Sequence, residues 1–398
     1  MFSSLSIRNF RIYWIGMFVS LVGTWIQIIA LSWLVFQLTD SEFLLGVTGF
    51  LSFIPVFLLS LFGGVAADRM NKRSILLFTQ TVFMCLAFIL AALTHLQIVR
   101  VPHIMFIALL SGVVMAFDAP SRQAIIVELV GKRYLLNAVA LNAVAFNSSR
   151  MIGPALAGIL VATIGMSGCF YINGISFLAM IVALLAIRID SGRMGAAKNS
   201  LSKDLAEGLE FIRRHRAILI LISMVGVTSL FGISYMILMP VFARNVLLVG
   251  MKGLGFLMSA VGIGALIAGL ILAGLGDFPH KGRLLVFSSI TFSISLILFS
   301  LSKSYLFSLG FLVLLGWAGV TTTAIINSLL QRLSPDEVRG RVMSAFMFTF
   351  AGIMPFGNLL AGSLAEAIGA PLTVALGGAI CGLFFLIINL RFPDIRRI

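Results

Sequence analysis

Long apolar stretches separated by short polar segments dominate this chain. The stretches at 12–38 and 74–96 match or exceed the ~20 residues that a helix needs to cross ~30 Å of hydrocarbon. Apolar length, read against turn and charge signals, predicts twelve membrane-spanning helices. The predicted spans of the first half cover 11–38, 44–67, 74–97, 103–127, 135–163 and 168–188. Those of the second half cover 217–246, 253–275, 283–302, 305–331, 340–367 and 371–391.

This pattern predicts an all-α membrane protein with its twelve helices in two six-helix halves. We expect an N-terminal bundle at 1–190, a cytoplasmic linker at 191–216 and a C-terminal bundle at 217–398. In the linker, Leu201, Leu205 and Leu209 follow helical spacing beside basic residues. That arrangement is typical of an amphipathic helix on an anionic membrane surface, and a solvated linker is the alternative interpretation.

Composition and charge narrow the class further. With 60% hydrophobic and 11% charged residues, the chain does not resemble a water-soluble domain. The formal charge of +14 does not indicate nucleic-acid binding, because the basic residues sit between apolar spans rather than on one polar face. Placing both termini in the cytoplasm puts most of the 28 basic residues on that side, which predicts the orientation.

Nothing in the sequence indicates catalysis, a cofactor or a metal. All three cysteines fall inside apolar spans and the four histidines are scattered, so we expect neither a disulfide nor a metal site. A GxxxxGK[ST] phosphate loop is absent from the sequence, and the polar segments are too short for a catalytic domain. We therefore expect neither an enzyme nor an ATP-driven pump.

The two halves repeat each other. Residues 46–68 align without gaps with residues 255–277, and at a second constant offset Gly153 and Gly158 align with Gly357 and Gly362. Because each copy holds six spans, the copies share one orientation and are related by an axis along the membrane normal. This predicts a cavity between the halves, opened to alternate sides by rocking.

The loop at 63–73 reads GGVAADRMNKR and resembles the signature of the major facilitator superfamily, with Asn71 where that family usually has Gly. The resemblance implies a conformational latch in which Gly64 allows close helix approach, Asp68 accepts hydrogen bonds from a helix N-terminus and Arg69 reaches a carboxylate. The expected latch residues are Gly64, Asp68, Arg69 and Arg73, with Asp277 in the second copy.

In the fifth span, Gly153, Pro154 and Gly158 lie in a run similar to the GPxxGG element of antiporters in that superfamily, departing from it at Ala157. The resemblance favours export. The alternative is a stripe of small residues that only packs helices together.

The segments at 116–124 (AFDAPSRQA) and 147–158 (NSSRMIGPALAG) resemble the branch that contains the bacterial enterobactin exporter and drug-efflux proteins. This implies a monomer in the bacterial cytoplasmic membrane that exports a siderophore-like or hydrophobic small-molecule substrate. Protons are the implied coupling ion, membrane lipid is the surrounding partner, and no cofactor is expected. An uncoupled lipid or solute facilitator and a non-transporting receptor are the alternatives.

Three charges inside predicted spans are candidate working residues, because a charge in hydrocarbon costs several kcal/mol unless it is paired. Asp118 and Arg122, four residues apart on the fourth span, are expected to pair with each other or with Arg69. Asp118 would either carry the coupling proton or belong to a structural ion pair. Arg150 would either neutralise Asp118 or present a cation to an anionic substrate.

The resemblance also implies that the first, fourth, seventh and tenth spans line the cavity. Ser and Thr in these spans can instead bond carbonyl groups of their own helix. The polar candidates for the cavity lining are Thr24, Gln27, Tyr235, Asn327 and Gln331.

Overall fold

The computed structural model describes residues 3–187, 210–276 and 278–392, and this part of the chain is almost entirely helical. The expected amphipathic segment around Leu205 and the latch residue Asp277 lie outside it. The first helices are α1 (Arg8–Thr39), α2 (Glu42–Arg69), α3 (Lys72–His95) and α4 (Val101–Ala186). The later ones are α6 (Arg216–Val227), α7 (Tyr235–Val241), α8 (Gly250–Leu275), α9 (Lys281–Leu301), α10 (Tyr305–Leu333), α11 (Asp336–Ile368) and α12 (Ala370–Arg391).

Ten helical stretches of the described residues are long and apolar enough to cross a membrane. One of them, α4, contains two bends, because Gly131 and Gly165 have φ values of +66° and +73° that a helix cannot hold. These bends divide α4 into segments 101–130, 132–164 and 166–186. With α4 counted as three segments, the described helices agree with the twelve predicted spans.

The seventh span is irregular. After α6 come a π-helical turn, Thr228–Gly232, then α7, then a second π-helical turn, Phe242–Val246. In the two turns Ile233 N bonds Thr228 O and Leu247 N bonds Phe242 O, which are i→i+5 hydrogen bonds. Pro240 lacks the N–H that a regular helix would use just before the second turn. Such turns insert one residue into a helix and are rare in regular spans.

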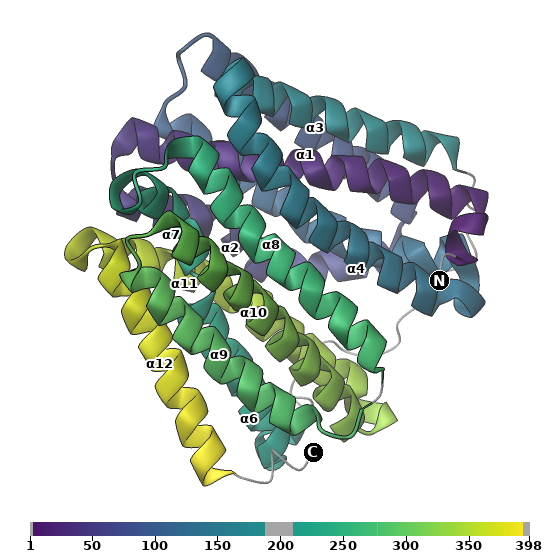
Figure 1. The fold of residues 1–398 in the computed structure, drawn as a ribbon. Coiled ribbons are helices and arrows are strands. Elements are labelled where there is room, and N and C mark those ends of the chain that lie inside the picture. Colours follow the sequence, from purple (N-terminus) through teal and green to yellow (C-terminus); the bar gives the residue numbers. More distant parts are fainter. Residues whose placement is uncertain (1–2, 188–209, 277, 393–398) are drawn as a thin grey trace. The chain divides into compact units, whose positions relative to one another are not determined.

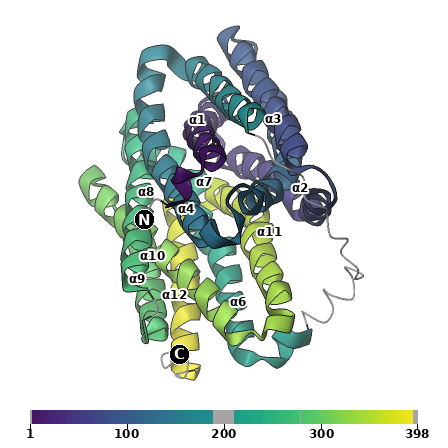
Figure 2. The ribbon, with the colours of Figure 1, turned by 90° about the vertical axis from the view of Figure 1, so that its right-hand side faces the viewer.

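The helices form two compact units. Unit 1 comprises Met1–Leu44, Leu51–Ala196 and Val249–Ser259, and unit 2 comprises Leu45–Phe50, Ala197–Leu248 and Ala260–Ile398. In unit 1 both α1 and α3 pack along α4 (Figure 1). In unit 2 α9 packs against α10 and α12, and α6 runs beside α11 (Figures 1 and 2).

The two copies of the sequence repeat also share close backbone contacts at aligned glycines. In unit 1, a Cβ atom added at Gly112 would lie 2.5 Å from Ser52 O. At the aligned position of unit 2, a Cβ atom at Gly316 would lie 2.1 Å from Val261 O. Since real Cβ atoms do not approach a carbonyl so closely, glycine allows the two backbones to touch in both units.

The loops repeat as well. Gly165 and its aligned partner Gly369 both hold a positive φ, +73° and +86°, between the last two spans of their copies. Each copy therefore ends its fifth span with the same backbone turn, one that L-residues adopt only with strain.

A further pair of aligned contacts involves the starts of α2 and α8. Within unit 1, a Cβ at Gly255 would lie 2.4 Å from Pro154 O and 3.0 Å from the Gly158 Cα. Within unit 2, a Cβ at the aligned Gly46 would lie 2.7 Å from the carbonyl oxygen of Asn358, the residue aligned with Pro154. The GPxxGG-like element is thus a surface of close helix contact.

We predict that Gly316→Ala lowers the free energy of unfolding by about 2 kcal/mol, because its methyl group meets backbone that cannot move aside. Gly310→Ala on the same helix is the matched control, since no described atom lies within 4 Å of its Cβ position. Denaturant unfolding of the purified protein in detergent measures both variants. Equal stability of the two variants would show that the backbone contact is not needed.

Candidate functional site

Asp118 is the centre of a hydrogen-bonded charge network inside unit 1. Its side chain is buried, with 2% of the residue exposed, in the first segment of α4. Arg122, one turn later, forms an ion pair through Nε with Asp118 Oδ2. From α3, Thr79 Oγ1 and Gln80 Nε2 each donate a hydrogen bond of 2.7 Å to Asp118 Oδ1. Three donors therefore converge on one carboxylate.

The network explains how a charge persists in this position. A buried carboxylate is tolerated when its charge is paired and its remaining lone pairs accept hydrogen bonds. Of the partners considered from the sequence, the structure places Arg122 on Asp118. Arg69 is exposed at the end of α2 and makes no ion pair among the described residues.

Arg150 lies against an aromatic side chain. Its guanidinium is 5.9 Å from the ring centroid of Trp25, and the Trp25 ring makes an edge contact with Phe146 at 6.1 Å. A cation over the face of a Trp ring is attracted by the ring quadrupole. This contact joins α1 to the middle segment of α4.

The sequence reasoning missed three residues, two that bond Asp118 and one that interacts with it electrostatically. Thr79 and Gln80 lie on the third span, which the superfamily resemblance does not place among cavity-lining helices. Tyr13 is fully buried on α1, within electrostatic range of both Asp118 and Arg122. An adjacent polar pair inside an apolar span, as at Thr79 and Gln80, is the signal that points to a buried partner.

The position of unit 2 that is aligned with Asp118 holds an uncharged residue, Thr322. Ser288 is aligned with Thr79, and Thr322 is aligned with Asp118. Thr322 Oγ1 donates to Ser288 Oγ at 2.9 Å, so the inter-helix hydrogen bond is kept while the carboxylate is not. The duplicated architecture therefore carries this charge in one copy.

The loop at 63–73 differs in detail from expectation. A Cβ at Gly63 would lie 1.9 Å from Ala116 O, whereas no described atom lies within 4 Å of the Cβ position at Gly64. In this structure Gly63 makes the close helix contact, and the latch role of Gly64 stays a prediction. The one-residue shift follows from the helical phase of α2, which turns Gly63 toward α4.

Two residues at the end of this loop, Asn71 and Arg73, make hydrogen bonds to helix ends. Arg73 donates from Nε to Leu184 O at 2.6 Å and from Nη2 to Leu185 O at 3.0 Å, which satisfies carbonyls at the end of α4. Asn71 caps α3 by accepting a hydrogen bond from Ser74 N at 3.2 Å, with a φ of −66° that does not require glycine.

Asp68 and Arg69 are the expected latch residues at the end of α2. Asp68 and Arg69 are exposed, and neither makes a hydrogen bond or ion pair within the described part of the chain. The latch role of these two residues stays a prediction.

The candidate cavity residues are engaged within their own units. Asn173 Nδ2 donates to Gln27 Oε1 at 2.8 Å, and Thr24 Oγ1 donates to Ser20 O at 2.9 Å. On α10, the other two candidates bond each other, as Gln331 Nε2 donates to Asn327 Oδ1 at 2.6 Å.

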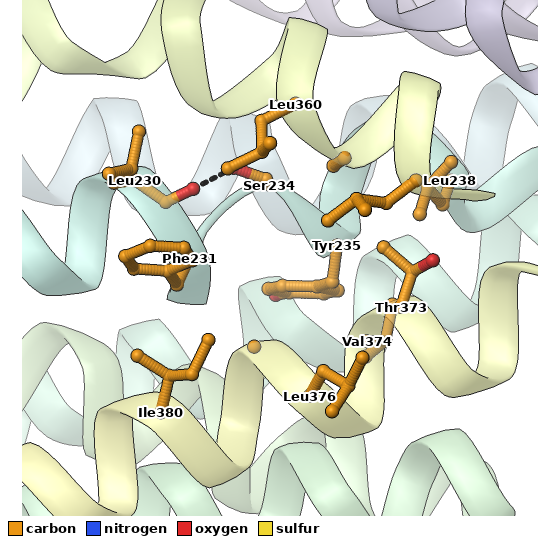
Figure 3. Close-up of a pocket in the computed structure, with 13 residues that line it drawn as sticks. Leu230, Phe231, Ser234, Tyr235, Leu238, Leu360, Thr373, Val374, Leu376 and Ile380 are labelled. Atoms are coloured by element: carbon orange, nitrogen blue, oxygen red, sulfur yellow. Dashed lines mark hydrogen bonds between the residues drawn. The ribbon is translucent and has the colours of Figure 1, made fainter. Parts of the chain in front are cut away.

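Tyr235 lines an apolar pocket of about 110 Å³ in unit 2, between the seventh span, α11 and α12 (Figure 3). Its ring contacts Phe299 edge-on at 6.5 Å. The hydroxyl groups of Ser234 and Thr373 bond carbonyls of their own segments, Leu230 O and Gly369 O, both at 2.9 Å. The pocket therefore offers apolar contact rather than polar recognition. No cluster of metal-binding side chains occurs among the residues that the structure describes.

Comparison with known proteins decides the family. The family described as transmembrane secretion effectors, within the major facilitator superfamily, matches residues 1–397. The chain belongs to this family. The resemblance seen in the loop at 63–73 and in the segment at 116–124 is thereby confirmed.

Several curated relatives match nearly the whole transporter. The staphyloferrin A transporter of Staphylococcus aureus is 27% identical, covering 96% of this chain and 94% of that protein. The multidrug efflux pump Tap of Mycolicibacterium fortuitum is 23% identical over 87% of each chain. The enterobactin exporter EntS of Shigella boydii is 23% identical, covering 98% of this chain and 92% of that protein.

Solved structures confirm the fold of this family member. A bacterial homologue of the human lysosomal transporter Spinster, in an inward-facing and unoccupied conformation, has a TM-score of 0.76 at 12% identity over 98% of both chains. A D-xylose–proton symporter also has a TM-score of 0.76, at 14% identity, covering 97% of this chain and 99% of that one. The predicted major facilitator fold is therefore correct.

We predict that Arg122→Gln lowers the free energy of unfolding by about 3 kcal/mol, because it leaves the Asp118 carboxylate buried without its counter-ion. The double variant Asp118→Asn/Arg122→Gln should recover much of that loss, since it removes both charges. Unfolding of the two single variants, Asp118→Asn and Arg122→Gln, of the double variant and of the wild type in detergent gives the coupling between the pair. A double variant as unstable as the sum of the single variants would contradict the pairing.

Proposed function

We propose that this protein is a secondary active transporter that exports a small organic solute from the bacterial cytoplasm by alternating access, in exchange for protons. Support for export comes from relatives that are named as a transporter of staphyloferrin A, a multidrug efflux pump and an enterobactin exporter. The proposed cargo is accordingly siderophore-like or hydrophobic and drug-like. The proposed setting is the inner membrane, with a monomer whose termini both face the cytoplasm.

The duplicated construction supports alternating access. Two copies related by an axis along the membrane normal can rock against each other about a site between them. The bias of basic residues toward one set of loops supports the orientation. Polar side chains of the first, fourth, seventh and tenth spans, among them Gln27 and Asn327, are the proposed cavity lining.

The buried Asp118 network is the single observation that carries proton coupling. Protonation of Asp118 would remove the charge that holds Arg122, and would change the hydrogen bonds from Thr79 and Gln80 on α3. A proton would thus favour one arrangement of α1, α3 and α4 over another. A ligand drives a conformational change only through such a difference in affinity for two states.

An uncoupled facilitator is the second candidate. It is favoured by the fact that both oxygens of Asp118 already accept hydrogen bonds, as in an ion pair that only supports the fold. In that case neutralising Asp118 would affect stability and leave transport driven only by the solute gradient. The following experiment separates the two candidates.

We predict that Asp118→Asn abolishes efflux driven by a proton gradient, because an amide holds no exchangeable charge. Proteoliposomes with an imposed pH gradient, tested with enterobactin and with a hydrophobic dye, measure solute flux and proton flux together. Asp336→Asn, an exposed carboxylate at the start of α11, is the matched control and should transport normally. Undiminished proton-driven efflux in Asp118→Asn would remove this residue from the mechanism.

We predict that two changes in the loop at 63–73 have different effects. Asp68→Asn should slow turnover at unchanged stability, since the exposed Asp68 is proposed to latch only one conformation. Arg73→Gln should instead reduce the stability of unit 1, because it leaves the carbonyls of Leu184 and Leu185 without their donor. Transport rates and melting temperatures of both variants test this. Unchanged turnover in Asp68→Asn would reduce the loop to a turn that sets topology.

A further inference from the structure

Three buried polar atoms, on side chains that bond Asp118 or interact with it electrostatically, have no hydrogen-bond partner among the described residues. They are the Tyr13 hydroxyl, Arg122 Nη1 and Gln80 Oε1. Leaving a buried donor or acceptor without a partner costs roughly 1–3 kcal/mol for each group. Three such atoms on residues associated with one buried carboxylate therefore require a physical explanation.

Two of the three atoms belong to side chains that bond Asp118, and the third belongs to Tyr13. Nη1 is two bonds away from the Nε that pairs with Asp118, within the Arg122 guanidinium. Oε1 is two bonds away from the Nε2 that donates to Asp118, within the Gln80 amide. Tyr13 lies within electrostatic range of Asp118 and Arg122 and packs in one core cluster with Leu76 of α3.

Their chemistry matches one water molecule. Arg122 Nη1 can only donate a hydrogen bond, Gln80 Oε1 can only accept one, and the Tyr13 hydroxyl can do either. A buried water typically makes about three hydrogen bonds to polar groups that otherwise have no partner.

We propose that Tyr13, Gln80 and Arg122 bind an internal water beside Asp118, and that this water is the direct proton donor and acceptor for the carboxylate. This inference rests on the proton coupling proposed above. In the step, a protonated water transfers its proton to an Asp118 oxygen. A new O–H bond forms on the carboxyl group as the O–H bond on the water breaks, which leaves neutral water and a neutral acid.

Tyr13 is the positioning residue of this site. The titratable groups that interact with it electrostatically are Arg122 and Asp118 of α4, and Asp118 also accepts hydrogen bonds from the uncharged Thr79 and Gln80 of α3. Farther along the two helices, Lys72 and Glu128 are paired with each other at 2.7 Å, and Arg73 donates to the carbonyls of Leu184 and Leu185. The phenol hydroxyl is therefore the group on α1 that can hold the water in place.

A second hydroxyl extends the polar face of α1. Ser20 follows Tyr13 by two helical turns, roughly 10 Å along the axis, and its buried hydroxyl also has no hydrogen-bond partner in the described chain. That separation is too long for direct contact.

The test uses the full-length protein and the variant Tyr13→Phe, which removes one hydroxyl group and keeps the ring. Infrared difference spectra across pH report the carboxyl band of protonated Asp118, identified by its loss in Asp118→Asn. Spectra in water labelled with heavy oxygen report the internal water through its isotope shift. Tyr171→Phe, on the last segment of α4, is the matched control.

We expect Tyr13→Phe to lose the isotope-shifted water band, to alter the pH profile of transport and to slow proton-driven turnover by about tenfold at an unchanged KM. Wild-type spectra and turnover should persist in Tyr171→Phe. A water band and a pH profile unchanged in Tyr13→Phe would overturn the water site. The absence of an Asp118 carboxyl band from the wild-type spectra would instead overturn the proton coupling on which the water site rests.

If Tyr13→Phe does not fold, the infrared spectra of the wild type still test the water site. An isotope-shifted water band that changes together with the Asp118 carboxyl band supports the site. An Asp118 band that appears with no accompanying water signal contradicts it.

Discussion

Close contact between helix backbones is the constraint on which the rest of this structure depends. In a bilayer, lipid tails are as apolar as leucine, so burial of apolar surface gives helices little reason to associate. Association then relies on tight packing. The aligned contacts of Gly112 with Ser52 and of Gly316 with Val261 show the same solution in both units. A side chain at these points would push α2 away from α4 in unit 1 and α8 away from α10 in unit 2.

The close packing of unit 1 supplies the hydrogen-bond donors and the counter-ion that stabilise its buried carboxylate. Asp118 meets Thr79 and Gln80 because α3 lies against α4, and it meets Arg122 because one helical turn separates them. In unit 2 the same geometry is kept by Thr322 and Ser288, which need no counter-ion. Duplication thus supplied two equivalent positions between helices, and only one of them holds a charge.

The fold was predictable from the sequence because span length and internal alignment are properties of the chain alone. The pairing of Asp118 with Arg122 was also accessible, since a spacing of four residues places two side chains on one helix face. The contributions of Gln80 and Tyr13 were not, because they depend on which helix lies opposite. Gly63 shows the same limit: a rotation of one residue, ~100° on a helix, decides which glycine meets α4.

The two π-helical turns of the seventh span have a consequence for how that span is interpreted. Each i→i+5 turn inserts a residue, so the angular phase of the side chains is shifted before and after it. A helical wheel drawn through 216–246 at a constant angle per residue would therefore assign Tyr235 and Arg244 to the wrong faces. Mutational scans of this span should be interpreted in three separate sections, each with its own phase.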